Sequence, residues 1–255
     1  MTAAAAPLRV GLGGGVLTLT LDRPDKRNAL NAALVEALHG ALERADLDAD
    51  VRVVVLRGAG RDFCAGADLD ELLASADLTL ADNEASALRL GAVFTRMRSL
   101  PKPIVAVVHG RALAGGAGLV TACDLAIAGA GAQIGYPEIQ RGFVPAMVMA
   151  FLRRAAGEKT ALDLVLTGRV LAATEARAAG LLARVVPDDG VEREVSAAVA
   201  ALVAASPSAL ALTKELFYRL DGQSLEDGIA LGARVNALAR QTPDFRAAIA
   251  QFLRR

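Results

Sequence analysis

The sequence is poor in the residues that form disulfides and metal sites. It contains two cysteines, Cys64 and Cys123, and two histidines, His39 and His109, in 255 residues. Two cysteines that stand so far apart do not form a disulfide framework, and they favour a reducing compartment. No Cys/His spacing typical of a zinc site occurs. The sequence therefore predicts no bound metal, and we expect a cytoplasmic protein.

Excess charge and long apolar runs are also missing. Lys and Arg together number 28, as do Asp and Glu, so the formal net charge is zero. This lacks the positive excess typical of general nucleic-acid binders. No stretch reaches the roughly 18 consecutive apolar residues of a membrane-spanning helix. The N-terminus, MTAAAAPLRV, has no signal-peptide pattern. We therefore expect no nucleic-acid and no membrane partner.

Signatures of nucleotide binding and serine hydrolysis are absent as well. The glycine-rich segment Gly11–Gly15 precedes a strand pattern, whereas a dinucleotide-binding loop follows one. The chain contains no G-x-x-x-x-G-K-[ST] phosphate loop and no G-x-S-x-G nucleophile elbow. His39 is expected at the surface. His109 ends a buried strand pattern, where a structural role is the simpler interpretation and a catalytic role stays open.

Hydrophobic patterns predict strands and helices that alternate through most of the chain. Val16–Leu21 alternates apolar and polar residues with period two. Ile104–Val108 is uniformly apolar and Val51–Leu56 is apolar except for Arg52, as expected of parallel strands buried on both faces. From about Glu192 onward only helical patterns occur. This indicates an α/β core at 1–191 and a helical C-terminal region at 192–255.

Three glycine-containing segments stand where predicted strands meet predicted helices. They are Phe63–Leu69 (FCAGADL), Leu113–Gly118 (LAGGAG) and Gly135–Ile139 (GYPEI). Glycine lets the backbone approach a ligand closely, and a helix N-terminus has N–H groups without intrahelical partners. Two such N–H groups directed at one oxygen would form an oxyanion hole. For any one segment alone, a turn or tight packing explains the glycines equally well.

Five segments in order, spread over almost the whole chain, resemble the crotonase superfamily, the enoyl-CoA hydratase/isomerase family. They are LDRPDKRNALN at 21–31, FCAGADL at 63–69, KPIVAVVHGRALAGGAGLVTACDLAIA at 102–128, IGYPEIQRGFVP at 134–145 and LTGRVLAATEARAAGLLARVVP at 166–187. The resemblance implies an α/β fold: a spiral of ββα turns followed by a helical C-terminal trimerisation region. It also implies a CoA thioester as substrate.

The family's functional positions can be carried over onto these segments. The resemblance implies that the N–H groups of Ala67 and Gly115 bind the thioester oxygen and that Glu138 is the acid–base. Contacts to CoA are implied for Lys26, Arg27, Ala29, Ala65, Asp68 and Leu69. No cofactor is implied, because CoA is part of the substrate. Homotrimers, often paired into hexamers, are the implied assembly.

One departure from the family pattern bears directly on the chemistry. The family's hydratases usually hold one water between two glutamates, and the first of these positions is Gly118 here. Glu138 alone could move a proton between Cα and Cγ, which is all that a Δ3,Δ2-enoyl-CoA isomerase requires. Hydration of a 2-enoyl-CoA is still the leading expectation, because similar single-glutamate sequences lie close to members called hydratases. Tyr136, Glu71 and Asp70 are candidate helpers, although packing or a surface position is the simpler interpretation.

A second departure is the segment GFVPAMVMA at 142–150. Its apolar side chains Val144, Met147, Val148 and Met149, with Phe151, either pack the core or form an acyl pocket in which flexible methionine adapts to chain shape. The apolar helices of the C-terminal region exceed what a monomer would cover, which favours a subunit interface. The remaining alternatives are another CoA-thioester lyase or hydrolase on the same scaffold and, least favoured, a non-catalytic CoA-thioester or RNA binder.

Overall fold

A six-stranded sheet forms the centre of the computed structural model, which describes residues 6–254. The strand order is β1-β2-β3-β4-β6-β9, and only the β1–β2 pair is antiparallel. The strands are β1 (Leu8–Gly13), β2 (Val16–Leu21), β3 (Val53–Gly58), β4 (Ile104–Val108), β6 (Leu125–Gly129) and β9 (Arg184–Val186). The parallel arrangement agrees with the uniformly apolar strand patterns of the sequence.

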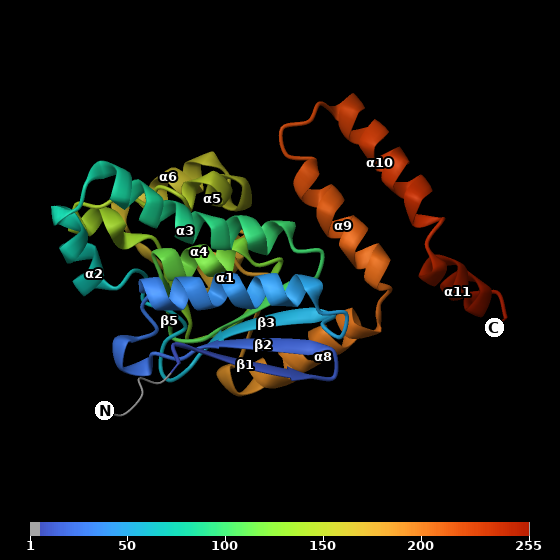
Figure 1. Cartoon of the computed structure of the whole chain (residues 1–255), viewed down its shortest axis with the longest axis horizontal. Coiled ribbons are helices and arrows are strands. Elements are labelled where there is room, and N and C mark those ends of the chain that lie inside the picture. Colours follow the sequence, from blue (N-terminus) through green and yellow to red (C-terminus); the bar gives the residue numbers. More distant parts are fainter. Residues whose placement is uncertain (1–5, 255) are drawn as a thin grey trace.

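The central strands are buried on both faces because helices cover the sheet from two sides (Figure 1). Val54 and Leu56 of β3 join the core that includes α1 (Ala32–Leu47) and α3 (Leu80–Ser99). Val53 and Val55, on the opposite face of the same strand, pack with α8 (Val191–Ala204). Alternate residues of β3 from Val53 to Leu56 thus belong to two separate cores, which is why these four positions are all apolar.

Helix α1 shows how local sequence fixes an element beside the site. Leu34, Leu38 and Leu42 are all buried, as their four-residue spacing predicts. Asn31 caps the helix by accepting a hydrogen bond from the Leu34 N–H at 3.0 Å. Asn28 instead adopts a left-handed conformation, with φ of 56°, in the turn before the helix.

A second, smaller sheet and a group of short helices lie around the site. The sheet has the order β5-β7-β8, with β5 (Arg111–Leu113) parallel to β7 (Gln133–Gly135) and β7 antiparallel to β8 (Val170–Ala172). The short helices are η1 (Pro24–Lys26), α2 (Leu69–Ala74), η2 (Ser75–Asp77), α4 (Gly115–Ala122) and η3 (Pro137–Arg141). Helix α4 follows β5 directly, and η3 follows β7. Because β5 and β7 are parallel, both helices start at the same end of this sheet.

The later part of the chain is mostly helical, as predicted. It contains α5 (Met149–Ala156), α6 (Glu158–Thr167), α7 (Ala173–Ala178), η4 (Asp188–Gly190), α8, α9 (Pro207–Arg219), α10 (Leu225–Ala239) and α11 (Pro243–Phe252). Figure 1 shows α9, α10 and α11 projecting away from the sheet, and neither α10 nor α11 buries a residue. The predicted class, an α/β core with a helical C-terminal region, is confirmed. The division at residues 191 and 192 stays a prediction.

The sequence also has strand patterns at Asp124–Ala128, Gln133–Ile134 and Ala183–Val186, which correspond to β6, β7 and β9. The strands β1, β5 and β8 were not predicted. β1 contains Gly11 and Gly13 and is mostly exposed, so it lacks the apolar alternation of its partner β2. β5 and β8 have three residues each, which is too short for a pattern to emerge. Within residues 6–254, no single helix is long and apolar enough to cross a membrane; only 188–204 and 207–219 together reach that length and composition, across a bend of 105°.

Candidate active site

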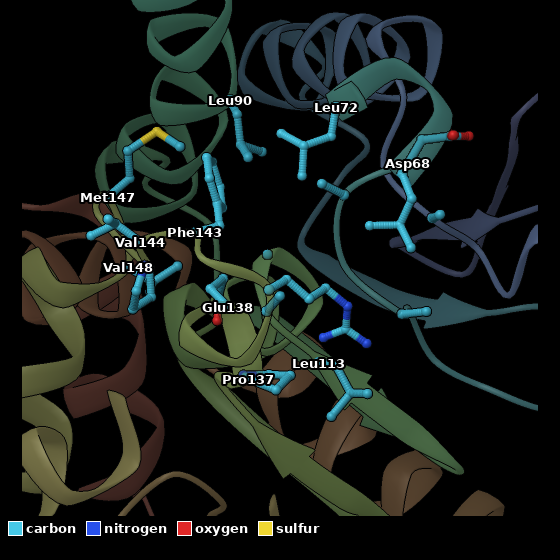
Figure 2. A pocket seen from close by; sticks show the side chains of 18 of the residues that line it. Asp68, Leu72, Leu90, Leu113, Pro137, Glu138, Phe143, Val144, Met147 and Val148 are labelled. Atoms are coloured by element: carbon cyan, nitrogen blue, oxygen red, sulfur yellow. The ribbon is translucent and has the colours of Figure 1, made fainter. Parts of the chain in front are cut away.

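A cavity of about 480 Å³ brings together every residue singled out for catalysis or CoA binding (Figure 2). Those nine lining residues are Lys26, Arg27, Ala29, Ala65, Ala67, Asp68, Leu69, Gly115 and Glu138. They come from four separate parts of the chain: the turn before α1, the segment 65–69 that leads into α2, the start of α4 and the start of η3. The fold therefore converges on one pocket from segments that are distant in sequence.

The loop before α2 is fixed by a short parallel ladder with the segment before α1. The Leu30 N–H donates to the Gly66 carbonyl at 2.7 Å, and the Asp68 N–H donates to the Leu30 carbonyl at 2.9 Å. Leu30 and Ala67 form an isolated parallel bridge. The bridge holds the Ala67 backbone in place. Within the described chain the Ala67 N–H has no hydrogen-bond partner, so this donor is available to a ligand.

The start of α4 is fixed by the smaller sheet. The Ala114 N–H donates to the Gly135 carbonyl of β7 at 2.8 Å. Ala114 has φ of 52° and ψ of −124°, a conformation rare for a residue with a side chain. Such strain costs on the order of 1–3 kcal/mol and concentrates at functional sites. Gly115, the next residue, is the first of the helix, and its N–H also lacks a partner among residues 6–254.

Both loops touch each other, and glycine is required at the contact. A Cβ placed on Gly66 would lie 2.8 Å from Cβ of Ala114. A Cβ placed on Gly116 would lie 2.4 Å from the carbonyl oxygen of Cys64. Either side chain would force the loops apart. The glycines therefore bring together the two segments that carry the Ala67 and Gly115 donors.

Glu138 lies on η3 and turns its carboxyl group into the pocket (Figure 2). The residue is only 9% exposed, and within residues 6–254 its Oε2 atom has no hydrogen-bond partner. Burial raises the pKa of the Glu138 carboxyl above its usual value, and the nearby Arg141 only partly opposes this. A carboxyl group with a raised pKa gives and takes protons nearer to neutral pH, as acid–base catalysis requires.

Apolar side chains occupy the space beside Gly118. A Cβ at this glycine would lie 2.6 Å from Cγ1 of Val148 and 3.0 Å from Cζ of Phe94. Both of those side chains line the cavity. A glutamate at position 118 would therefore meet Val148 and Phe94 before it reached the pocket. In the described part of the chain, Glu138 is thus the buried carboxylate of the cavity without an ion-pair partner, and the side of the cavity at Gly118 is apolar.

The apolar side chains of the second departure, the segment 142–150 with Phe151, are divided between the cavity and the core. Val144, Met147 and Val148 line the cavity, which agrees with the acyl-pocket interpretation. Met149 and Phe151 are partly buried against the main core and do not line it. Sequence reasoning missed Leu72, Leu90 and Phe94, which complete the wall from α2 and α3. The apolar stripe of α3 predicts that Leu90 and Phe94 face the interior. It does not show which of its residues face a cavity.

Charged residues surround the proposed CoA side of the cavity. Lys26 and Asp70 form an exposed ion pair at 2.9 Å. Arg23, another residue that sequence reasoning missed, pairs with Asp68 at 2.9 Å. Burial disfavours ionisation of Asp68, but the hydrogen bond from Arg23, the backbone hydrogen bonds at the start of α2 and the charge of Arg23 together outweigh it and lower the pKa of that carboxyl. The Asp68 side chain also caps α2 by accepting from the Asp70 N–H.

The other candidate helpers have structural contacts. Tyr136 is fully buried, and its hydroxyl lies 2.5 Å from Oγ1 of Thr121. The Glu71 carboxylate accepts a hydrogen bond from the first N–H of α1, at Ala32. His109 lies outside the cavity lining, with Nε2 3.0 Å from a backbone carbonyl oxygen. Among the described residues, Glu138 is thus the one buried carboxylate of the cavity that no ion pair or helix cap occupies.

Comparisons with known proteins agree over nearly the whole chain. Residues 11–255 match the family model described as enoyl-CoA hydratase/isomerase. A Thermus thermophilus relative that carries an enoyl-CoA hydratase name is 43% identical over 239 residues, 94% of each chain. The 2,3-dehydroadipyl-CoA hydratase of Escherichia coli K12 is 35% identical over 241 residues, 94% of this chain and 92% of that one. A crystal structure of the enoyl-CoA hydratase of Mycobacterium smegmatis superimposes with a TM-score of 0.93 at 34% identity, covering 97% and 96% of the two chains.

Proposed function

The chain belongs to the enoyl-CoA hydratase/isomerase family, and we propose that it hydrates a 2-enoyl-CoA reversibly, with Glu138 as its single acid–base residue. It is an enzyme of the hydratase/isomerase type and acts on acyl-CoA thioesters. The observation that carries the mechanism is the buried Glu138 carboxyl in a cavity that also receives two loops with unpaired N–H groups.

The proposed oxyanion hole follows from thioester chemistry. Addition to Cβ of a 2-enoyl thioester places negative charge on the carbonyl oxygen. The Ala67 and Gly115 N–H groups are held on rigid loops, so they could receive that charge without reorganising. One donor of this kind typically contributes about 2.7–4 kcal/mol to transition-state stabilisation. The activation thus comes from the thioester and the backbone, and the proposal requires no cofactor beyond substrate CoA.

Glu138 would move the proton. In the hydration direction its carboxylate takes a proton from water while the water oxygen bonds to Cβ. The resulting enolate is held by the two N–H groups, and the protonated Glu138 then gives the proton to Cα. Water is added across the double bond, and the carboxylate is regenerated. General acid–base assistance of this kind contributes roughly 10²–10⁴-fold.

CoA itself would lie along the charged side of the cavity. Lys26, Arg27 and Asp68 supply charged or polar groups there, and Ala29, Ala65 and Leu69 supply backbone and apolar surface. The exposed cations suit the phosphates of CoA. The thioester would then point inward, toward the two loops and Glu138.

Double-bond isomerisation is the second candidate function, favoured by one observation. Gly118 supplies no carboxylate, and Val148 and Phe94 take up the adjoining space. Isomerisation of a 3-enoyl-CoA needs only that Glu138 remove a proton from Cα and return it to Cγ. The same oxyanion hole would stabilise the dienolate that forms between these two proton transfers. The two functions therefore differ in the substrate accepted and in the need for water.

The deciding experiment supplies 2-enoyl-, 3-enoyl- and 3-hydroxyacyl-CoA separately and identifies the products by mass spectrometry. A hydratase interconverts the 2-enoyl and 3-hydroxyacyl thioesters and incorporates oxygen from ¹⁸O water. An isomerase converts 3-enoyl to 2-enoyl thioester without ¹⁸O. Free CoA as the main product would indicate a hydrolase, and no turnover of any substrate would contradict the proposed function.

We also propose a homotrimer, alone or as a pair of trimers, in the cytoplasm. Helices α9 to α11 expose large apolar side chains, among them Phe217, Ile229 and Phe252 at 69%, 65% and 74%. Surface of this kind supports an interface between subunits. The two cysteines are buried and free, which suits a reducing compartment. Sedimentation as a monomer at micromolar concentration would contradict the assembly.

A further inference from the structure

The turn before α1 carries three of the residues implied to contact CoA, and its backbone is strained. Arg27 and Asn28 are successive residues with side chains in the left-handed region, with φ of 50° and 56°. This conformation costs free energy for residues other than glycine, so it persists only where the surroundings enforce it. Contacts from outside the turn therefore hold Lys26, Arg27 and Ala29 in place.

Asn28 makes two of these contacts. It is fully buried, and its side-chain amide donates to the backbone carbonyls of Ala59 and Asp62, both at 2.8 Å. The Arg27 carbonyl in turn accepts a hydrogen bond from the Ala65 N–H at 3.0 Å. The backbone of Arg27 is thus fixed on the segment that follows β3.

The same segment presents a buried carboxylate to the Arg27 side chain. Asp62 is 3% exposed, and its Oδ1 accepts from the Arg111 N–H at 3.0 Å. Its Oδ2 is buried and has no hydrogen-bond partner within residues 6–254. Two cations face this oxygen: Nε of Arg61 lies 3.5 Å away and Nε of Arg27 lies 4.0 Å away. Because a buried carboxylate oxygen without a hydrogen bond is costly, these two cations are what compensates its charge.

The two cations differ in their relation to the catalytic cavity. Arg27 lines the cavity, whereas Arg61 does not. The Arg27 side chain is 54% exposed, so without a restraint its guanidinium would sample many rotamers. A guanidinium binds phosphate best as a planar fork in a fixed direction. A restraint from Asp62 would therefore reduce the cost of ordering Arg27 when an anion binds.

We propose that Asp62 is a positioning residue for CoA, whose carboxylate holds the Arg27 guanidinium in the direction of a phosphate group of CoA. This rests on the proposed function, since it takes a CoA thioester as the substrate. Asp62 does not line the cavity, so it acts on substrate affinity through Arg27 and not on proton transfer at Glu138. Loss of its charge should then weaken CoA binding, although removing a negative charge would by itself strengthen the binding of an anion.

The test uses the 2-butenoyl thioesters of CoA and of pantetheine, which lacks the phosphates. Steady-state kinetics gives kcat and KM for each substrate. Calorimetry with free CoA, 3′-dephospho-CoA and pantetheine gives affinities that do not depend on turnover.

Asp62→Asn keeps the Oδ1 acceptor for the Arg111 N–H and removes the charge that faces Arg27. Asp163→Asn is the matched control, because Asp163 also pairs with an arginine, Arg169, but lies outside the cavity. Circular dichroism and thermal unfolding check that both variants are folded.

We expect Asp62→Asn to raise KM for the CoA thioester and Kd for free CoA about fivefold, the effect of one partly exposed ion pair, with kcat within about twofold of wild type. The pantetheine thioester should show no change, and Asp163→Asn should behave as wild type on both substrates. Arg27→Gln should weaken CoA binding to a similar degree. In that background Asp62→Asn should add less than about twofold, as expected of two residues in one interaction.

The 3′-dephospho-CoA arm identifies the phosphate. If Arg27→Gln no longer weakens binding of this ligand, Arg27 binds the 3′-phosphate. If the effect persists, Arg27 binds the diphosphate. Either result supports the inference, since both place a phosphate of CoA at Arg27.

Four results would overturn the inference. Equal losses on the two thioesters in Asp62→Asn indicate a packing role. Tighter CoA binding by this variant shows that the carboxylate only repels the anion. An undiminished effect in the Arg27→Gln background means that Asp62 acts through another group, such as Arg61. Wild-type protein that binds pantetheine as tightly as CoA holds no phosphate here. If the wild type turns over neither thioester but prefers free CoA to pantetheine, the proposed function fails and the inference stands.

Discussion

The two sides of the catalytic cavity are built in different ways. On one side, backbone of 64–68 and 113–116 is locked by hydrogen bonds and by contacts too close for a Cβ atom. On the other side, the wall consists of Leu90, Phe94 and the 144–148 segment, which contribute apolar side chains. The first side holds the Ala67 and Gly115 N–H groups in place, and the second side determines only the shape of the cavity.

This difference separates chemistry from substrate choice. Substitutions of side chains leave backbone donors that are held by other backbone atoms largely unchanged, so the first side would preserve the proposed oxyanion hole. Side chains such as Met147 can be exchanged with little effect on the fold, so the second side can change which acyl group fits. Glu138 stands where the two sides meet. Variants that break one side and not the other test this view.

The largest effect is expected at Glu138, with both sides left intact. Glu138→Gln keeps size and hydrogen-bonding capacity but removes the base, so kcat should fall roughly 10²–10⁴-fold while KM changes little. Steady-state kinetics on a 2-enoyl-CoA measures both. Glu84→Gln, at an exposed position of α3 outside the cavity, is the matched control and should behave as wild type. Full turnover by Glu138→Gln would rule out this residue as the acid–base.

The next largest effect is expected from a substitution that disrupts the backbone side of the cavity. Gly66 has φ of +100°, and a Cβ there would lie 2.8 Å from Cβ of Ala114. Gly66→Ala should push the loops apart and cost roughly 10²–10³-fold in kcat, the effect of losing one oxyanion donor. Gly222→Ala is the control, because Gly222 has φ of +79° but no atom within 4 Å of its Cβ position.

These two glycine variants share the strain of a left-handed alanine, on the order of 1–2 kcal/mol. Only Gly66→Ala adds the collision between loops. Thermal unfolding should therefore show a lower Tm for both, whereas only Gly66→Ala should lose kcat. Equal activity of the two variants would mean that the contact between the loops does not position the donors.

The backbone side was also the more predictable one. Strand-to-helix junctions with glycine can be recognised locally, because helix starts and glycine-dependent contacts leave a signature within a few residues. That is why the FCAGADL and LAGGAG segments were found from sequence. The apolar run Val53–Leu56 of β3 and the apolar strand β4 were predictable for a similar reason, since burial on both faces disfavours polar residues.

The side-chain wall could not be predicted in the same way. Phe94 and Val93 are neighbours on α3 and are equally apolar and buried, yet only Phe94 lines the cavity. Which of them does so depends on how α3 packs against the 144–148 segment, a long-range contact with no local pattern. Arg23, which positions Asp68 from 45 residues away, was missed for the same reason.

A smaller effect is expected where the wall meets the backbone side, at Gly118. Gly118→Glu alone should overpack the site, because its Cβ would lie 2.6 Å from Val148. Overpacking costs typically about 1–3 kcal/mol, so stability and activity should both fall. Adding Val148→Ala removes the obstructing methyl groups and should raise hydration about tenfold above the single variant.

Val148→Ala alone is the control for the enlarged pocket, and unfolding curves are recorded for all three proteins. If the folded double variant hydrates no faster than Gly118→Glu, a second carboxylate at this place does not assist water addition. Hydration would then depend on Glu138 and the oxyanion hole alone.

The smallest effect is a shift with pH, and it concerns the carboxyl group between the two sides. Because burial raises the pKa of Glu138, the acid limb of kcat/KM should lie above the value of about 4.3 for an ordinary glutamate. A folded-state pKa above the unfolded one means that the folded protein binds the proton more tightly. Ionised Glu138 therefore lowers stability at neutral pH, and this loss disappears as pH falls through the raised pKa to the unfolded one.

Glu138→Gln has no charge to bury, so it should unfold at higher urea concentration than wild type at pH 7. The difference should shrink as the pH is lowered toward 4, with a slope of at most about 1.4 kcal/mol per pH unit, the value for one proton. Urea unfolding of both proteins at several pH values measures it, and Glu84→Gln should show no such pattern. A wild type that is more stable than Glu138→Gln at pH 7 would mean that the ionised carboxylate is stabilised where it lies, and the pKa of Glu138 would then not be raised by burial.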